Sequence, residues 1–457
     1  MRPLSNGAKP TLPGPPPSRL AVIYRRIEEL RPDPRNPRSH SPRQIRQIAR
    51  SVQTFGFNVP ILIDCQSRVI AGHGRLLAAR ELGWGEVPTI SLDHLSETQR
   101  QAFMIADNRL TDTSQWNDTL LAGLLRDLSV LELDFSLDST GFEMAEIDMR
   151  IVGLEAPPEA ADPADHVPHT ASRPLVSRVG DVWAAGRHRI SCGSALDPVA
   201  HAILMDGEQA AMVFSDPPYN VAIDGHVSGL GKIHHREFAM ASGEMDEAQF
   251  VDFLTRSFTL LGRHSVDGAI HFQCIDWRHA GEMLAAGRRA YSELKNICVW
   301  VKSNAGMGSL FRSQHELVFV FKHGRGPHQN NVQLGRHGRH RSNVWSYPGA
   351  NSFGRRSEEG NLSELHPTVK PVAMVADAML DCSSRGEIVL DAFLGSGTTV
   401  IAAERTGRRC FGLEIDPLYV DTIVRRWQAF TGDHARLVAT GRDFSSLETD
   451  AELGRDR

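Results

Sequence analysis

A regular alternation of short apolar runs and amphipathic segments in the second half of the chain constrains its fold most. The apolar runs lie at 211–215, 269–273, 297–302, 317–321, 388–391 and 410–415. Segments with helical periodicity lie at 247–261, 276–287, 372–382, 397–406 and 417–430. Strands that alternate with helices in this way predict an α/β domain with a mostly parallel sheet.

Composition shifts divide the rest of the chain. Residues 1–19 contain six prolines and no apolar periodicity, which predicts a flexible tail. Residues 20–154 show the strand and helix signals of a small α/β module with a helical extension. Pro, Ala and Asp dominate 155–174, which predicts a linker. We therefore expect a second domain over 175–435, followed by a C-terminal tail over 436–457.

Composition also excludes several classes of protein. The chain has 457 residues, enough for two or three domains, and lacks an apolar run long enough to span a membrane or to serve as a secretory signal. Its six cysteines form no CxxC pair, which argues against a disulfide framework or a zinc ribbon and favours the cytoplasm. The formal charge of -5 gives no overall attraction to nucleic acid. We expect no metal, because His234-His235 and His337…His340 lack further ligands at suitable spacing.

The sharpest short motif is Asp216-Pro217-Pro218-Tyr219, which directly follows the apolar run 211–215. Ligand sites of α/β sheets lie beyond the carboxyl ends of strands, where this motif falls. The exocyclic amine of a base is a poor nucleophile, and a carboxylate with a proline-fixed carbonyl can accept its N–H groups and stabilise developing positive charge. An aromatic ring beside them can stack on a base turned out of the duplex. At this point a simple proline turn after a strand remains the alternative.

A second motif, Asp-Ala-Phe-Leu-Gly-Ser-Gly-Thr-Thr at 391–399, follows the apolar run 388–391. Gly395 and Gly397 at a strand-to-helix turn let the backbone approach a ligand closely. Glu414 ends the next strand, about 20 residues on, where a carboxylate can bind both ribose hydroxyls of a nucleoside cofactor. A purely structural glycine turn is the alternative.

Together with His366-Pro367-Thr368-Val369-Lys370-Pro371, these motifs resemble the amino-group DNA methyltransferases over about residues 175–430. The catalytic motif precedes the cofactor loop, as in the permuted beta class. The resemblance implies a Rossmann-like domain, S-adenosyl-L-methionine as cofactor and catalysis by Asp216–Tyr219. The cofactor-binding residues that it implies are Asp391, Phe393, Gly395, Ser396, Gly397, Thr398, Glu414, His366 and Lys370.

From Leu317 to Ser357 the chain has no Asp or Glu, and its basic residues are interleaved with aromatic ones. Basic side chains neutralise phosphates and arginine can also recognise guanine. In the resembled family this position belongs to target recognition, so 322–365 is expected to contact double-stranded DNA. A solvated basic loop is the alternative. The predicted DNA-binding residues are Arg336, Arg339, Arg341, Arg355 and Arg356.

The first module resembles the ParB-like nuclease superfamily over about residues 25–110, through motifs such as Asn36-Pro37-Arg38 and Gly72-His73-Gly74-Arg75. In relatives the latter loop opens a helix and holds nucleotide phosphates. Here His73 and Gly74 depart from the Glu-Arg of chromosome-partitioning proteins, which leaves a DNA-positioning or docking role as the alternative.

We therefore predict a site-specific methyltransferase that acts on adenine N6 of duplex DNA after base flipping. Cytosine N4 is the first alternative, although cytosine enzymes of this family more often carry Ser in place of Asp216. A non-catalytic ParB-like DNA-binding or partitioning factor is the second alternative, and methylation of RNA or of a protein amide is the third. A homodimer and a cognate restriction endonuclease are candidate partners, no membrane is expected, and the sequence does not decide the recognition site.

Overall fold

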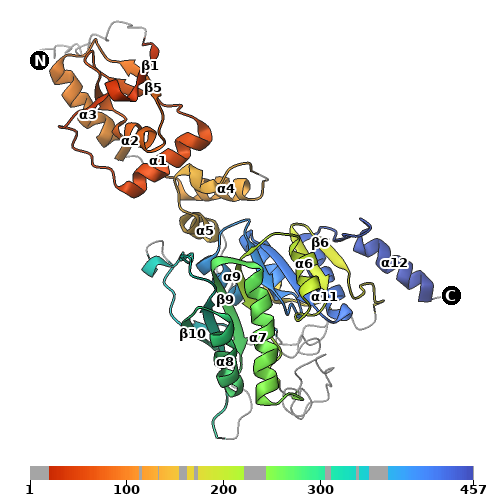
Figure 1. The fold of residues 1–457 in the computed structure, drawn as a ribbon. Coiled ribbons are helices and arrows are strands. Elements are labelled where there is room, and N and C mark those ends of the chain that lie inside the picture. Colours follow the sequence, from red (N-terminus) through yellow and green to blue (C-terminus); the bar gives the residue numbers. More distant parts are fainter. Residues whose placement is uncertain are drawn as a thin grey trace, which may run out of the picture. The chain divides into compact units, whose positions relative to one another are not determined.

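The computed structural model describes residues 20–112, 116–131, 133–153, 162–168, 173–220, 243–303, 310–335, 339–348 and 369–455. The chain divides into two compact units, Met1–Glu143 and Met144–Arg457 (Figure 1). The predicted DNA contacts Arg336, Arg355 and Arg356 lie outside the described residues, as do His366 and the pair His234-His235.

The first unit is a small α/β module. Its five-stranded sheet has the order β1-β5-β3-β4-β2. A core of apolar side chains from β3, β4, α2 and β5 lies against it. The elements are β1 (Val22–Arg26), β2 (Arg31–Pro32), α1 (Pro42–Phe55), β3 (Ile61–Ile63), β4 (Arg68–Ala71), α2 (His73–Glu81), β5 (Glu86–Ser91), α3 (Glu97–Asp112) and α4 (Asp118–Ser129).

The second unit is built on a ten-stranded sheet with the order β12-β10-β11-β9-β8-β13-β14-β7-β6-β15. Strands β9, β8, β13, β14 and β7 run parallel, and β10 and β11 form an antiparallel hairpin beside β9. The strands are β6 (Val182–Ala185), β7 (His188–Cys192), β8 (Ala210–Ser215), β9 (Ser265–Ile275), β10 (Glu293–Val301), β11 (His315–Lys322), β12 (Val344–Ser346), β13 (Ile388–Asp391), β14 (Arg409–Glu414) and β15 (Arg436–Leu437).

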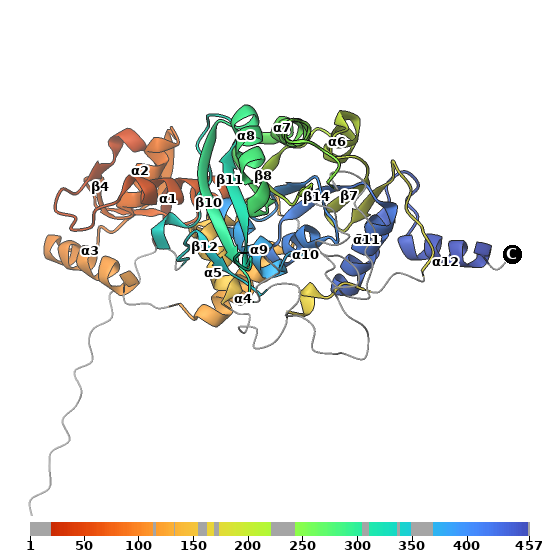
Figure 2. The same ribbon diagram turned by 90° about the horizontal axis from the view of Figure 1, so that it is seen from below.

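Helices cover both faces of this sheet. Figure 2 shows α6, α7 and α8 along one face and α9, α10 and α11 along the other. Alternate strand residues enter the two cores, so Val213 packs with α7 while Met212 and Phe214 pack with α9 and α10. The helices are α5 (Met144–Val152), α6 (Pro198–Met205), α7 (Glu247–Arg263), α8 (Ala280–Ala290), α9 (Val372–Cys382), α10 (Thr398–Thr406), α11 (Pro417–Thr431) and α12 (Phe444–Arg455).

The predicted fold class is confirmed, and each predicted strand and helix of the second domain is present with its ends shifted by a few residues. Within the described residues no helix has both the length and the apolar character that a membrane crossing needs.

Two segments that the sequence places in a linker and a tail pack onto the second unit. In the linker range, Arg405 donates two hydrogen bonds to Asp162, and buried Asp165 accepts one from the backbone of Val372. In the tail range, the Phe444 ring packs edge-on against Trp183 with ring centroids 5.1 Å apart. Both segments are polar on average, but a few buried side chains anchor them.

Helix α5 is joined to the rest of the second unit by a buried ion pair. Asp148, 1% exposed, accepts hydrogen bonds from Arg408 at 2.8 and 3.1 Å and from Arg385 at 2.9 Å. The Arg408 side chain is fully buried. A charge this deep is costly unless it is paired, so Asp148 keeps α5 on this unit.

We expect Asp148→Ala to lower the free energy of unfolding of the second unit by about 3–5 kcal/mol, because Arg408 is left buried without its carboxylate. Urea unfolding followed by fluorescence of its buried tryptophans measures this; they are Trp183, Trp300, Trp345 and Trp427. Glu208→Ala is the control, since that 42% exposed side chain pairs with Arg409 at the surface. Equal, small losses in both variants would contradict the assigned role of Asp148.

Candidate functional site

The ends of several strands meet at one edge of the large sheet. Strands β8 and β13 pair in parallel with Val213 opposite Leu390, so their carboxyl ends lie side by side. The motif Asp216–Tyr219 leaves β8 at this edge and residues 391–398 leave β13, while Glu414 ends neighbouring β14. Parallel pairing therefore brings the two sequence motifs together.

The turn after β8 holds Asp216 and Tyr219 against each other. The Tyr219 hydroxyl donates a hydrogen bond to Oδ1 of Asp216 at 2.6 Å. Pro217 is buried and Pro218 is half-buried, which fixes the backbone between them. Asn220 has a left-handed backbone with φ of 54°, and its side chain accepts from the backbone N–H groups of residues 243 and 245. The motif is thus a rigid turn that keeps its carboxylate at the sheet edge.

Lys370 lies at the centre of the site. Its Nζ is 2.5 Å from Oδ2 of Asp216 and 3.3 Å from Oε2 of Glu316. The same ammonium lies 5.5 Å from the centre of the Tyr219 ring. Its side chain is only 5% exposed. The sequence placed Lys370 at the cofactor, whereas its ammonium contacts the catalytic motif.

Glu316 is a site residue that sequence reasoning missed. It lies at the start of β11, whose antiparallel direction brings its first residues to the carboxyl end of β9. One Glu316 oxygen lies 3.0 Å from the Tyr219 hydroxyl, and the other accepts a hydrogen bond from Lys302, which follows β10. The only sequence signal for it is a carboxylate directly before an apolar strand.

These contacts shift the pKa values of the buried groups. Burial and the neighbouring Glu316 raise the pKa of Asp216, against the attraction of Lys370. Burial also raises the pKa of the Tyr219 hydroxyl. Burial alone would also raise the pKa of Glu316. The nearby ammonium groups of Lys370 and Lys302 outweigh this effect and lower the pKa of Glu316 to about 2. Glu316 therefore stays ionised at neutral pH, and Asp216 has the higher pKa of the two carboxylates.

The loop after β13 is held by Asp391. Its carboxylate accepts hydrogen bonds from the backbone N–H of Phe393 at 2.9 Å and from the Thr399 hydroxyl at 2.6 Å. Ser396 is buried, and its carbonyl accepts from Arg426 at 3.0 Å. Asp391 and Arg426 thus hold the loop from two sides, and neither contact needs a ligand.

Helix α10 starts where a glycine is required. Gly397 has φ of 83°, and a Cβ there would lie 2.8 Å from the Ile423 side chain. Thr398 begins the helix, and its hydroxyl donates to the carbonyl of Lys370 at 3.2 Å. A hydrogen bond therefore joins the glycine loop directly to the Lys370 segment.

The Glu414 carboxylate faces the loop from β14. It accepts hydrogen bonds from the backbone N–H of Gly395 at 2.8 Å and from that of Asp416 at 2.9 Å. Burial raises its pKa to about 7, and burial raises the pKa of Asp391 to about 7 as well. A buried carboxylate beside a glycine turn at a helix N-terminus fits a nucleoside with free ribose hydroxyls.

The structure departs from the sequence interpretation at Arg339 and Arg341. Arg339 is 6% exposed, and Nη2 lies 2.5 Å from Asp381. Arg341 lies 3.1 Å from the same carboxylate and donates to the Tyr347 hydroxyl at 2.9 Å. Both guanidinium groups form ion pairs with carboxylates of α9 inside the domain, so we do not assign them to DNA phosphates.

The ParB-like loop begins α2 of the first unit. Gly72 has φ of 95°, and a Cβ on Gly74 would lie 2.8 Å from Ile48, so both glycines are needed for the backbone and packing. Burial and the neighbouring His40 lower the pKa of His73. Arg75 reaches the carbonyl of Pro60 at 3.4 Å. Phosphate binding by this loop stays a prediction.

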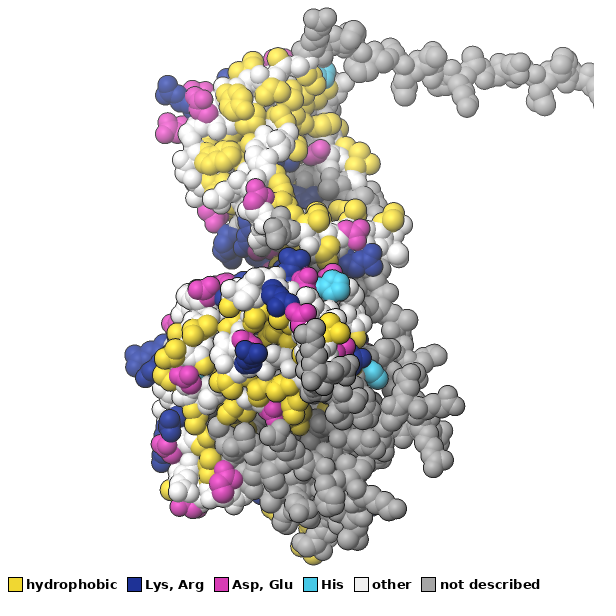
Figure 3. Space-filling view, turned by 90° about the vertical axis from the view of Figure 1, so that its right-hand side faces the viewer, with side chains coloured by type: hydrophobic (Ala, Val, Ile, Leu, Met, Phe, Trp, Pro, Cys, Tyr) yellow, Lys and Arg dark blue, Asp and Glu magenta, His cyan; other side chains and the backbone are white. Residues whose placement is uncertain are grey.

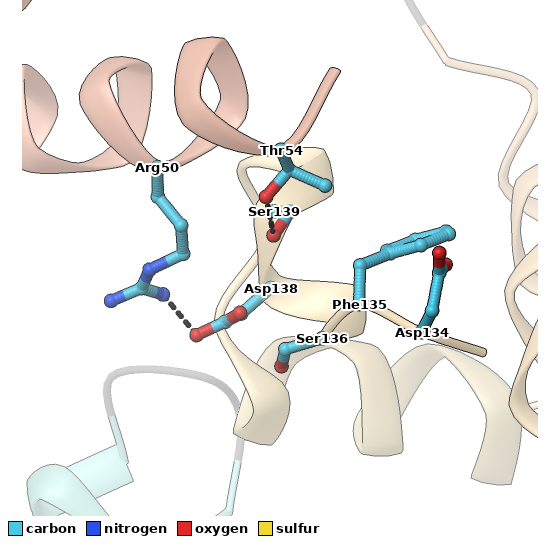
Figure 4. Close-up of a pocket in the computed structure, with 7 residues that line it drawn as sticks. All are labelled: Arg50, Thr54, Asp134, Phe135, Ser136, Asp138 and Ser139. Carbon is cyan, nitrogen blue, oxygen red and sulfur yellow. Dashed lines mark hydrogen bonds and ion pairs between the residues drawn. The ribbon is translucent and has the colours of Figure 1, made fainter. Parts of the chain in front are cut away.

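The first unit also has a hollow of about 490 Å³, lined by Arg50, Thr54, Asp134, Phe135, Ser136, Asp138 and Ser139 (Figure 4). Arg50 forms an ion pair with Asp138 there, and Thr54 lies 2.9 Å from the Ser139 hydroxyl. The other carboxylate oxygen of Asp138 is buried without a hydrogen-bond partner. Among the described residues, no cluster of three or more His, Cys, Asp or Glu could hold a metal ion.

On the face shown in Figure 3, basic and acidic side chains are interspersed.

Comparison with known proteins agrees with this geometry. The profile of a DNA methylase family matches residues 210–425, a ParB N-terminal domain profile matches 19–108, and a ParB-methyltransferase HTH domain profile matches 119–179. The chain is 42% identical over 83 residues to the ParB-like nuclease domain-containing protein YnaK of Escherichia coli (strain K12), covering 18% of this chain and 95% of that protein.

It is 24% identical over 253 residues to the Type II methyltransferase M2.MboI of Moraxella bovis, covering 52% of this chain and 87% of that protein. Among solved structures, a putative DNA modification methylase from Thermus thermophilus in complex with S-adenosyl-L-methionine matches 56% of this chain and 96% of its own, with 21% identity and a TM-score of 0.38.

The chain carries an amino-group DNA methyltransferase domain over residues 210–425 and a ParB-like domain over residues 19–108. The predicted enzyme class, the methyl donor S-adenosyl-L-methionine and the DNA substrate are thereby confirmed. The non-catalytic alternative loses its support, because the methylase profile spans the whole site from β8 to α11.

We expect the cofactor-free methyltransferase to lose stability as the pH rises from 6 to 8. Asp391 and Glu414 each have a pKa raised to about 7, so the folded chain binds their protons more tightly than the unfolded chain does. The resulting stability is complete below the unfolded pKa near 4 and is lost as the pH rises through about 7.

Glu414→Gln should remove one of these contributions. Between pH 6 and 8 the wild type should therefore lose about 1 kcal/mol more than the variant. Urea unfolding at both pH values measures the difference, and parallel pH dependences of the two proteins would contradict the raised pKa.

Proposed function

We propose that the enzyme methylates N6 of adenine in duplex DNA, on a base turned out of the helix into the edge of the sheet. The observation that carries this proposal is the hydrogen-bonded pair of Asp216 and Tyr219 directly beside the glycine loop. Asp216 offers an acceptor for the amine and Tyr219 offers a ring for the base. Asp at this position favours adenine over cytosine by family resemblance.

For the cofactor, we propose that Glu414 binds the ribose hydroxyls and that the loop Gly395–Thr398 lies along the nucleoside. The methyl donor supplies an electrophilic methyl group bound to a positively charged sulfur. Phe393 packs against the Phe253 ring with centroids 6.1 Å apart, and because it is only half-buried we propose that its remaining surface lines the cofactor. Lys370 is assigned to Asp216 rather than to the cofactor because of its 2.5 Å contact there.

In the proposed reaction the chain acts on the amine. Asp216 accepts one amine N–H, and the backbone carbonyl fixed by Pro217 and Pro218 accepts the other, which turns the nitrogen lone pair toward the methyl group. With a methyl donor bound, the amine nitrogen would take the methyl group from sulfur and would become positively charged. The N–H bond to Asp216 then breaks, the proton passes to this carboxylate, and the electron pair returns to nitrogen. Its raised pKa suits Asp216 to this proton transfer.

Asp216→Ala should lower the methylation rate by about 100- to 1000-fold, since one preorganised contact to the developing charge is worth about 3–4 kcal/mol. The rate is measured with tritiated methyl donor on unmethylated plasmid. Cofactor affinity by calorimetry is the control and should stay close to that of the wild type. A loss of less than about tenfold would remove Asp216 from the reaction.

The methylated base identifies the target. Plasmid DNA treated with the wild-type enzyme is digested to nucleosides, and mass spectrometry distinguishes N6-methyladenine from N4-methylcytosine. N4-methylcytosine would overturn the adenine assignment and would leave the amino-methyltransferase activity in place.

For DNA contact, we keep the basic segment 322–365 as the target-recognition region but restrict the proposal to Arg336, Arg355 and Arg356. Replacing all three by Ala should flatten the slope of log affinity against log salt by up to about 2.7, because each phosphate contact contributes about 0.9.

Arg339→Ala is the contrasting variant. It should lower the stability of the fold, because it removes one of the two arginines that pair with the buried Asp381, and it should leave the salt slope unchanged. Fluorescence anisotropy over a salt series tests both. A flattened slope in Arg339→Ala alone would reverse the assignment.

The remaining proposals concern organisation and partners. We propose the ParB-like module as a unit that positions DNA. The predicted limits 20–154 and 175–435 need revision, because α5, residues 162–168 and Phe444 pack with the second unit. A cognate restriction endonuclease is suggested by the name of the Type II relative. A homodimer and a cytoplasmic location stay predictions.

A further inference from the structure

Four charged side chains lie together at the end of β8, and we call Asp216, Glu316, Lys302 and Lys370 the charge cluster. Glu316 and Lys370 are its buried members, whereas Asp216 and Lys302 are 20% and 29% exposed. Lys370 bridges the two carboxylates, and Lys302 forms an ion pair with the other oxygen of Glu316. Two negative and two positive groups give the cluster a net charge of zero.

Burial makes this balance important. The side chains of Glu316 and Lys370 are 9% and 5% exposed, so water screens their charges weakly. Within the cluster, only Asp216 is assigned to the substrate. Without Glu316, two ammonium groups would face this single carboxylate, and the site would carry a net positive charge.

A net positive charge would oppose the reaction in two ways. Lys370 would hold Asp216 more tightly and weaken its acceptor strength toward the amine. The positive charge would also repel a positively charged methyl donor and the charge that develops on the amine nitrogen.

We propose that Glu316 is an electrostatic positioning residue of the methyl-transfer site, which neutralises Lys302 and Lys370 so that Asp216 remains available and a cationic methyl donor is accepted. This inference rests on the proposed function. It adds a second carboxylate to the site, one that the catalytic motif does not contain.

A purely structural role predicts something different. Glu316 also contacts the Tyr219 hydroxyl at 3.0 Å, so its loss could simply loosen the site. Loosening would weaken every ligand, whereas a change in charge should weaken charged ligands more than neutral ones. The methyl donor and its demethylated product separate these cases, because S-adenosylmethionine has a positively charged sulfur and S-adenosylhomocysteine has a neutral one.

The experiment is a charge cycle on the full chain. Calorimetry gives the affinity of S-adenosylmethionine relative to S-adenosylhomocysteine for the wild type, Glu316→Gln, Lys302→Gln and the double variant. Glu293→Gln is the matched control, since this carboxylate is 50% exposed at the other end of β10 and pairs with Lys295.

We expect Glu316→Gln to lower the affinity ratio by about tenfold, as a unit charge in a poorly screened site would. Lys302→Gln should raise the ratio, the double variant should return it to the wild-type value, and the control should not change it. The rate of methylation should fall in Glu316→Gln and recover in part in the double variant.

An unchanged ratio in Glu316→Gln, or equal weakening of both ligands, would overturn the inference. If Glu316→Gln does not fold, the sign of the change in Lys302→Gln decides, and a ratio that stays or falls there overturns it as well. Failure of the proposed function can be distinguished from failure of this inference. If the proposed function is wrong, the wild-type enzyme leaves adenine unmethylated, whatever the variants do.

Discussion

The parallel pairing of β8 with β13 is the constraint on which the rest of the site depends. Met212 lies opposite Val389 and Val213 opposite Leu390. A shift by one residue would exchange the side chains of the two cores, because neighbouring strand residues face opposite sides. The fit of these side chains into the two cores holds the register, and the register places Asp216 beside the glycine loop. A hydrogen bond of 3.3 Å from Ser215 to Asp391 connects the two strand ends.

Local pattern was enough to predict most of the fold and half of the site. Strands β8, β13 and β14 are covered on both faces and consist mostly of apolar residues, so their positions follow from the sequence, whereas the parallel strand β7 (His188–Cys192) has no continuous apolar run and was not predicted. Asp216 and Glu414 were found because they directly follow or end such runs. Glu316 was missed because its role depends on a residue 97 positions away in sequence and on the antiparallel direction of β11. Direction is a property of the assembled sheet.

Charge patterns were the least reliable guide, and the reason is physical. The segment from Leu317 to Ser357 has no acids of its own, which predicts a basic surface. Helix α9, however, presents Asp377 and Asp381 one turn apart, and these neutralise Arg339 and Arg341. A run of one charge in sequence is therefore a basic surface only if no other element supplies its counter-charges.

The segment 162–168 is connected by hydrogen bonds both to the Lys370 segment and, through Arg426, to the glycine loop. Asp165 accepts a hydrogen bond from Val372, two residues after Lys370, and the carbonyl of Ala164 accepts one from Arg426 at 2.8 Å. Arg426 in turn donates to the carbonyl of Ser396 in the glycine loop. The lysine that bridges the two carboxylates and the loop assigned to the methyl donor are thus anchored to the same short piece of chain. Because methyl transfer requires the amine and the methyl group to be aligned, a shared anchor restricts the relative movement of the two elements that carry them.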